Sequence, residues 1–324
     1  MGFTNFPNGV TSFGIPVYGD GGMSAVGGNT YWVKKSTDTD YARFKRMHNV
    51  VYPDSGYNAV QTTVAGAFAA ALKNDRIVIM APDSGGHDLT GTITISQFGL
   101  KVYGMSNSPY LQRTMIKLPT TATDVNMFII KADKVEIAGL TLQNRKAGVC
   151  VQIGDAAGQA YYQTYIHDCN MTDYGGVATY GITPGAIAGA DTDQCDTVNL
   201  TVENCYFDGF VTAAIKSNGT RDAYVNNYIK VPSAGNGIHI FKHTDSRGGG
   251  LYKGNFMLGA GNSMGILVTD VGSTACANNI VDNYFVGFGT ALTQPITQQT
   301  NLQGGGNMYA AAANGTWTAI DIVA

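Results

Sequence analysis

The chain has 324 residues, with 42 glycines, a net charge of −3 and only 13% charged residues, which is about half the usual charged share. Its only two glutamates, Glu136 and Glu203, exclude long charged helices and favour a β-rich chain with many turns. The charge offers no broad basic surface for nucleic acid, and no segment is apolar enough for a membrane-spanning helix. The five cysteines include no CxxC pair, so we expect reduced, buried cysteines and no zinc site.

Residues 1–28 combine many glycines with scattered large apolar side chains such as Phe3, Phe6 and Phe13. This composition is too apolar for a solvated tail and too rich in glycine for an independent core. We therefore expect an arm that packs on another protein, with a disordered N-terminus as the alternative. Because residues 30–33 read as a first strand, we divide the chain into 1–50, the arm and first strand, and 51–324, a solenoid.

A basic segment follows this first strand. Its five basic residues outnumber two acidic ones: Lys34, Lys35, Arg43, Lys45 and Arg46 against Asp38 and Asp40. Such a segment is either simply solvated or faces an acidic surface of a partner.

Residues 58–73 form the one helix that the sequence predicts. Asn58 can serve as its N-cap, and Val60, Val64, Phe68 and Leu72 recur every four residues as an apolar stripe. A buried strand follows at residues 77–81. Because the open end of a solenoid exposes a sheet edge and the uncovered apolar core, we expect this helix to cap the N-terminal end.

Apolar alternation predicts further strands at residues 92–95, 100–103, 115–118, 127–130 and 135–137. From residue 139 a four-residue signature recurs: Gly, Asp or Asn, then Leu, Cys or Asn, then any residue, then a large apolar residue. Its second position falls on Leu140, Cys169, Cys205, Asn227, Asn255, Asn283 and Asn307. Self-similarity at a period of about 20 to 50 residues indicates a solenoid.

A second signature, a small residue followed by alternating aliphatic residues, lies between copies of the first. Its copies are residues 148–151, 186–188, 214–216, 237–240, 265–268, 291–292 and 319–322. Two or three short strands per turn of about 25 residues are typical of a parallel β-helix. We expect Asn227, Asn255, Asn283 and Asn307 to stack as a hydrogen-bonded ladder, with Cys169 and Cys205 as small apolar residues in the same place.

These segments resemble those of the right-handed parallel β-helix (pectate-lyase-like) proteins. The resemblance rests on the capping helix, on residues 76–82 (RIVIMAP) and 135–142 (VEIAGLTL), and on the asparagine-containing coils. It covers residues 50–324 and implies the fold, an all-β right-handed parallel β-helix solenoid with an N-terminal capping helix, rather than a function. Residues 2–17 resemble the N-termini of tailed-bacteriophage virion proteins, in which a glycine-rich arm anchors a protruding module.

The resemblance implies that lyases of this fold need calcium-binding acids with a basic Lys or Arg, and that hydrolases need two or three close acids. The hydrolase signatures are absent from this chain. The best acidic cluster is Asp191, Asp193 and Asp196, which is either a calcium site or an ordinary polar loop.

A second candidate group consists of His239, His243, Asp245 and Arg247. His239 lies between two isoleucines and should therefore face outward, where it could line a groove or bind a metal with His243. However, the two histidines have a helical spacing on a predicted strand and would not converge. His167, beside Asp168, reads as a turn residue.

Three functions are open. We favour a virion structural protein of a tailed bacteriophage, most simply a trimeric capsid-decorating (cement or head-spike) protein attached through its arm to the major capsid protein or another virion protein. The alternatives are a small tailspike or fibre that binds or cleaves host polysaccharide, and a secreted polysaccharide lyase or glycosidase. No catalytic, cofactor-binding or metal-binding residue is assigned. We expect a non-enzyme without cofactors, nucleic-acid or membrane partners, located in the virion after synthesis in the bacterial cytoplasm.

Overall fold

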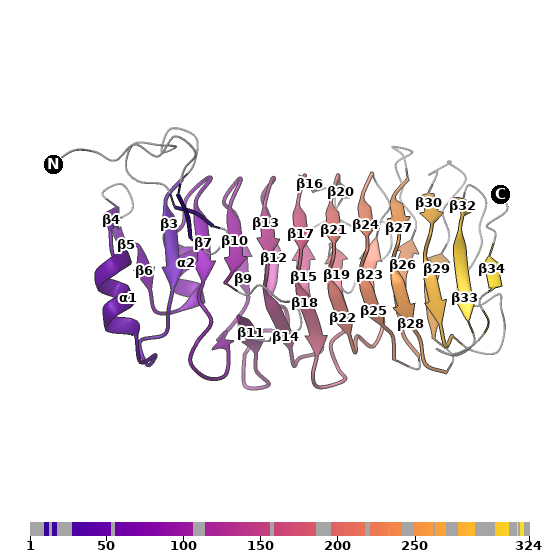
Figure 1. Ribbon diagram of the computed structural model, residues 1–324, viewed down its shortest axis with the longest axis horizontal. Helices are drawn as coiled ribbons and strands as arrows, with labels where there is room; N and C mark the ends of the chain where they lie inside the picture. Colours follow the sequence, from indigo (N-terminus) through magenta and orange to yellow (C-terminus); the bar gives the residue numbers. More distant parts are fainter. Residues whose placement is uncertain are drawn as a thin grey trace.

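The structure is a computed structural model. It describes residues 10–12, 15–17, 28–52, 56–105, 114–155, 159–185, 196–217, 221–232, 234–241, 249–261, 263–269, 278–288, 302–310, 316 and 318–320. Within this part of the chain, three long sheets run side by side along a rod (Figure 1). No helix in the same part is long and apolar enough to cross a membrane.

Sheet I, as we call it, is the 11-stranded sheet. In spatial order it contains β6 (Val60–Gln61), β3 (Thr30–Val33), β7 (Arg76–Ile79), β10 (Lys101–Gly104), β13 (Glu136–Ala138), β17 (Tyr165–His167), β21 (Thr201–Glu203), β24 (Ala223–Val225), β27 (Leu251–Lys253), β30 (Asn278–Val281) and β32 (Leu302–Gly305). All pairs in it are parallel, as in β10 and β13, where Val102 lies opposite Ile137.

Sheet II has ten strands: β8 (His87–Asp88), β11 (Met115–Leu118), β14 (Thr141–Asn144), β18 (Asn170–Asp173), β22 (Tyr206–Asp208), β25 (Tyr228–Lys230), β28 (Phe256–Leu258), β31 (Tyr284–Val286), β33 (Asn307–Ala310) and β34 (Thr318–Ile320). Sheet III has seven: β9 (Ile93–Ile95), β12 (Phe128–Ile130), β15 (Val149–Ile153), β19 (Tyr180–Pro184), β23 (Ala213–Ser217), β26 (Asn236–Phe241) and β29 (Met264–Thr269).

The central coils pass through sheets I, II and III in turn, as in β13, β14 and β15, and the next coil (β17, β18 and β19) pairs with this one strand for strand. The described residues also form three two-stranded sheets: β1 (Val10–Ser12) with β2 (Ile15–Val17), β4 (Val51–Tyr52) with β5 (Tyr57–Asn58), and β16 (Ala160–Tyr162) with β20 (Asp196–Val198). The predicted fold class, a parallel β-helix, is confirmed.

The first sequence signature is the turn from sheet I into sheet II. Its first position has a left-handed backbone in every copy, with φ between 52° and 69°: Gly139, Asp168, Asn204, Asn226, Gly254, Asp282 and Gly306. Glycine, asparagine and aspartate adopt this conformation most readily. The recurring residue types are therefore explained by the backbone geometry of one repeated turn.

The second position of this turn forms the predicted asparagine ladder. Asn255 Oδ1 accepts hydrogen bonds from the backbone N–H and from Nδ2 of Asn227, both at 3.0 Å. The same pattern links Asn255 to Asn283 and Asn283 to Asn307. At the other end Cys205 N donates to Asn227 Oδ1. The ladder is confirmed, and it satisfies backbone groups that are fully buried.

The core fills the space between the three sheets. Ile137, Ile166 and Val202 lie inward in successive coils of sheet I, and each is no more than 1% exposed. Further along, the Tyr224 and Tyr252 rings stack at 5.2 Å in the same row. Cys150, Cys169 and Cys205 are free and buried, as predicted, while the other two cysteines lie outside the described residues.

The capping helix is shorter than predicted. It is α2 (Val64–Ala70), and its N-cap is Thr63, whose Oγ1 accepts a hydrogen bond from Gly66 N. Asn58 instead belongs to β5 and Val60 to β6, because that segment pairs in extended form with its neighbours. Leu72 follows the helix and is 46% exposed.

The helix α2 nevertheless closes the N-terminal end of the core. Its buried residues Val64, Ala67, Phe68 and Ala70 pack beside β3, β6, β7 and β9, with the Phe68 and Phe128 rings 5.7 Å apart. A second helix that the sequence analysis missed, α1 (Tyr41–His48), lies further out and buries no residue. The predicted arm falls largely outside the described residues, apart from the β1–β2 hairpin.

Two copies of the second signature were placed wrongly. The strand of the coil assigned to residues 186–188 is β19, in which Ile182 aligns with Val151 and Ile215. Residues 318–320 form β34, which runs antiparallel to β33 and so does not continue the parallel coils. Residues 186–188 and 291–292 lie outside the described residues.

Candidate functional site

The acidic candidates of the sequence analysis are not brought together by the described structure. Asp191 and Asp193 lie outside the described residues, and for Asp196 only its backbone place at the start of β20 is described. The calcium interpretation of these residues therefore stays a prediction.

His239 lies on the outer face of sheet III, as its alternation with Ile238 and Ile240 predicts. Those two neighbours are no more than 1% exposed, and His239 lies in register between Lys216 and Leu267. His243, Asp245 and Arg247 lie outside the described residues, so a site made of these four residues stays a prediction.

A different group of polar side chains meets on the outer face of sheet I. Adjacent strands carry Lys101 and Tyr103 on β10, Glu136 on β13, Tyr165 and His167 on β17, and Glu203 on β21. The inward residues between them fill the core, so these side chains point away from it. Both glutamates of the chain are in this group.

His167 contacts the carboxylates of Glu136 and Asp168, so it is more than a turn residue. Its Nε2 lies 3.3 Å from Glu136 Oε1 and its Nδ1 lies 2.7 Å from Asp168 Oδ2. Since each ring nitrogen faces a carboxylate oxygen, both must donate, and the ring is an imidazolium. Glu136 Oε2 also pairs with Lys101 Nζ at 2.9 Å.

Tyr165 links His167 to Glu203. Its ring stacks on the His167 ring at 4.1 Å with an interplanar angle of 23°. Its hydroxyl donates to Glu203 Oε2 at 2.9 Å. These contacts fix both aromatic rings across three successive coils.

The pKa values agree with this geometry. The hydrogen bond from His167, together with Lys101 and against the opposing effect of burial, lowers the pKa of Glu136 to about 2. Burial lowers the pKa of His167, but the bonds to Glu136 and Asp168 outweigh it and raise this pKa to about 9. Burial and Glu203 raise the pKa of Tyr165 to about 12. All three groups therefore keep one protonation state near neutral pH.

A depression of about 300 Å³ lies beside this group, at the edge where the chain enters sheet I. It is lined by Asn74, Arg76, Phe98, Gly99, Lys101, Lys134, Val135, Glu136, Gln163 and Tyr165. This size is at the lower end for ligand sites in proteins. We call the depression, with Tyr103, His167 and Glu203, the sheet I site.

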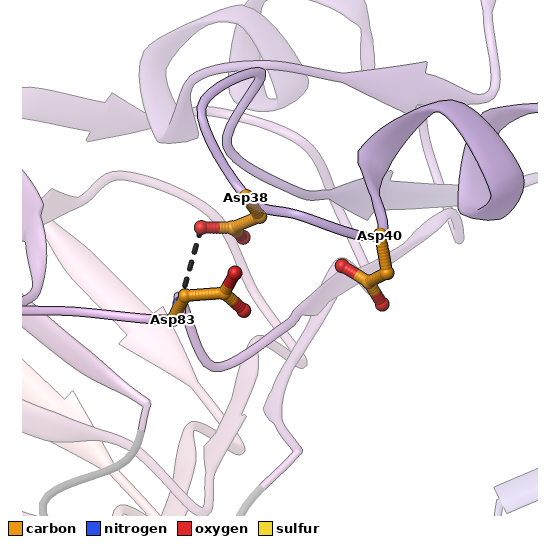
Figure 2. A group of neighbouring side chains, drawn as sticks. All are labelled: Asp38, Asp40 and Asp83. Atoms are coloured by element: carbon orange, nitrogen blue, oxygen red, sulfur yellow. Dashed lines mark hydrogen bonds between the residues drawn. The ribbon is translucent and has the colours of Figure 1, made fainter.

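Another cluster of acids lies near the N-terminal end, where Figure 2 shows Asp38, Asp40 and Asp83 close together. Lys34 Nζ lies 3.2 Å from Asp38 Oδ2 and 2.8 Å from Asp40 Oδ1, so an ammonium group already neutralises part of the cluster. Asp83 Oδ2 accepts from Thr39 N and Oγ1. The cluster therefore ties the segment before α1 to the loop after β7, and we assign it a structural role.

The sheet I site was not predicted from the sequence, although the residue pattern that indicates it is present. Each copy of the first signature is preceded by an inward apolar residue flanked by outward ones: Ile137, Ile166 and Val202 in the three central coils. Aligning those flanking residues by coil would have placed Glu136, Tyr165, His167 and Glu203 on one face.

Comparisons with known proteins show the fold alone. No protein-family model and no curated protein matches the chain. The structure of YbhC from Escherichia coli is similar with a TM-score of 0.51 and 13% identity, covering 93% of this chain and 80% of that one. An alginate lyase from Paenibacillus sp. str. FPU-7 matches with a TM-score of 0.45 and 14% identity, covering 78% and 93%. ORF18 of Geobacillus virus E2 matches with a TM-score of 0.40 and 14% identity, covering 77% and 58%.

Proposed function

We propose that this chain is a rigid, carbohydrate-binding rod, and that the sheet I site holds a polysaccharide. The observation that carries this proposal is the line of outward polar and aromatic side chains over β10, β13, β17 and β21. Successive coils lie about 4.8 Å apart, so an extended ligand along the rod axis meets one set of side chains per coil. Aromatic rings and fixed hydrogen-bonding groups are the means by which such sites hold sugars.

The setting that we propose is a tailed-phage particle. Its support is the resemblance of residues 2–17 to virion N-termini, and the anchoring role of the arm follows from that resemblance. A glycan-binding rod corresponds to the tailspike or fibre interpretation of the sequence. Capsid decoration by a trimer stays a prediction, which imaging particles with and without the protein would test.

We infer that the site binds without cleaving. General acid–base catalysis at neutral pH is most efficient when the pKa of the catalytic group lies near 7. Glu136 is held ionised and His167 protonated by their mutual contacts, and the pKa of Tyr165 is raised to about 12. None of these three groups therefore has the pKa that favours proton transfer near neutral pH.

The experiment is binding of the purified full chain to an array of bacterial capsular and O-chain polysaccharides, with release of reducing or unsaturated sugars measured in parallel. We expect binding of at least one polysaccharide without release. Tyr165→Ala should abolish binding, because it removes the ring and the Glu203 contact, whereas Tyr284→Ala, an exposed tyrosine on sheet II, should not. Binding unaffected by Tyr165→Ala would contradict the placement of the site, and sugar release would contradict the absence of cleavage.

A further inference from the structure

We propose that copies of this chain assemble around a three-fold axis parallel to the rod, and that the outer face of sheet II lies at this axis. The partner on this face is therefore the same face of two further copies. The inference does not depend on polysaccharide binding, because the sheet I site belongs to a different sheet of the rod.

The outer face of sheet II carries a row of aromatic and apolar side chains, which we call the sheet II row. Its members lie in register on successive strands: Tyr206 on β22, Tyr228 on β25, Phe256 on β28, Tyr284 on β31 and Met308 on β33 (Figure 1). The residues that follow them, such as Phe207 and Phe285, are fully buried, so the row points away from the core. Aromatic residues make up only 10% of the chain, so composition alone does not explain four in succession at one outward position.

The rings of this row stack on one another along the rod. Tyr206 and Tyr228 lie 5.4 Å apart with an interplanar angle of 17°, and Tyr228 and Phe256 lie 5.2 Å apart with an angle of 18°. Tyr228 thus has a ring on each side, and a sugar or a base cannot stack on a ring face that is already covered. Tyr284 is 42% exposed. An exposed apolar row of this kind is typical of a contact with protein.

The row is uncharged, as a three-fold contact requires. An axis of this kind brings each residue beside its own two copies, so a charged residue there would face like charges. The row continues on the earlier strands of sheet II with Met115, Thr141 and Asn170. At this outward position, no described strand from β11 to β33 carries a charge. A tyrosine hydroxyl both donates and accepts hydrogen bonds, so it can pair with its own copies.

The other two sheets do not meet this requirement. The outward residues of sheet I include six that carry or can carry a charge: Arg76, Lys101, Glu136, His167, Glu203 and Lys253. Those of sheet III include Lys216 and His239. On sheet II the charged residues Asp208 and Lys230 lie two positions beyond the row and pair with each other at 3.3 Å. Sheet II is therefore the face that identical copies can share with the least repulsion.

The size and spacing of the face also fit further copies of the same chain. From β11 to β33 the row covers eight strands, or roughly 34 Å along the rod. A contact of this length and about 25 Å wide buries the roughly 800 Å² per copy that is typical of a specific interface. Another copy has the same coil spacing, so each ring lies at the height of its own copies.

The first experiment places charges on the row and measures mass by sedimentation equilibrium. The wild type should have three times the 34.2 kDa of one chain, whereas Tyr284→Lys and Tyr284→Glu should each have the mass of one chain, because like charges meet at the axis. Mixing the two variants should restore a trimer, because unlike charges then meet. Asn279→Lys, at an exposed position on the outer face of β30 in sheet I, should stay a trimer. A monomeric wild type, or trimeric Tyr284 variants, would overturn the proposal.

The second experiment tests whether each residue meets its own copies. Tyr284→Cys should form a disulfide between two chains when oxidised in air, seen as a dimer that a thiol reductant reverses on a denaturing gel. Asn279→Cys and the wild type should form none. Because cysteine is small and uncharged, this variant decides the question even if the charged variants do not fold. Absence of the link at position 284, or a link at position 279 instead, would overturn the placement of the axis on sheet II.

Discussion

At the scale of single residues, the sheet I site is a chain of paired charges. Lys101, Glu136, His167 and Asp168 alternate in sign, and each contact is within 3.3 Å. His167 and Glu136 support one another: the imidazolium lowers the pKa of Glu136, and the two carboxylates raise the pKa of His167. The stability of the rod should therefore depend on pH through these two residues.

We predict that wild-type stability is lost on both sides of a window between pH 4.5 and 6.5. The contribution of His167 is complete below its unfolded pKa of 6.5 and disappears as pH rises through about 9. The contribution of Glu136 is complete above its unfolded pKa of 4.5 and disappears as pH falls through about 2. Thermal melts of the wild type and of His167→Gln measure this dependence. A variant with the same loss between pH 6.5 and 9 as the wild type would contradict it.

At the scale of elements, the turn from sheet I to sheet II holds the coils in register. Four asparagines satisfy each other's amides and the backbone of the neighbouring coil, and each is no more than 1% exposed. Cys169 and Cys205 fill the same place earlier in the stack without a side-chain amide. The ladder therefore matters most where successive coils all carry an asparagine. Replacing one asparagine there leaves the hydrogen-bonding groups of its neighbour without a partner.

Asn255→Ala should destabilise the protein by about 2 to 4 kcal/mol, because it leaves the Asn227 N–H and the Tyr224 carbonyl without their partner inside the core. Asn279→Ala, on the outer face of β30, should change stability by less than about 0.5 kcal/mol. Chemical denaturation of the two variants measures the difference. Equal losses would show that stacking of the coils, and not the amide contacts, stabilises this turn.

At the scale of the whole molecule, the described strands of sheet I span roughly 48 Å at about 4.8 Å per strand. A rod of this kind presents long side faces, and the sheet I site occupies only one of them. We expect from the sequence that three copies pack through such faces. Packing of that kind must leave the sheet I site open if the proposed function is correct.

Sedimentation equilibrium of the full chain should therefore give a mass three times the 34.2 kDa of one chain. Polysaccharide binding by the assembled species should equal three sites per trimer, because no site is covered. A monomer at micromolar concentration would contradict the assembly, and one binding site per trimer would show that the sheet I face is buried between copies.

The sequence by itself determined the fold class, the asparagine ladder and the buried cysteines. These features repeat along the chain, so each copy confirms the others, and left-handed turns restrict the residue types that can occupy them. It also placed most strands of sheets II and III to within a residue or two, whereas most strands of sheet I were not predicted. The N-terminal cap was predicted less well, since α1, β4, β5 and β6 occur once and have no repeat to confirm them.

Only the tertiary structure decided the site. Lys101, Glu136, His167 and Glu203 are separated by 31 to 36 residues at each step along the chain but by one strand spacing in the sheet. Coil lengths vary, so the sequence period does not say which outward residues become neighbours. The register of the sheet decides which outward residues are neighbours, because the inward apolar residues set the pairing of the strands. The outward polar residues are brought together as a consequence.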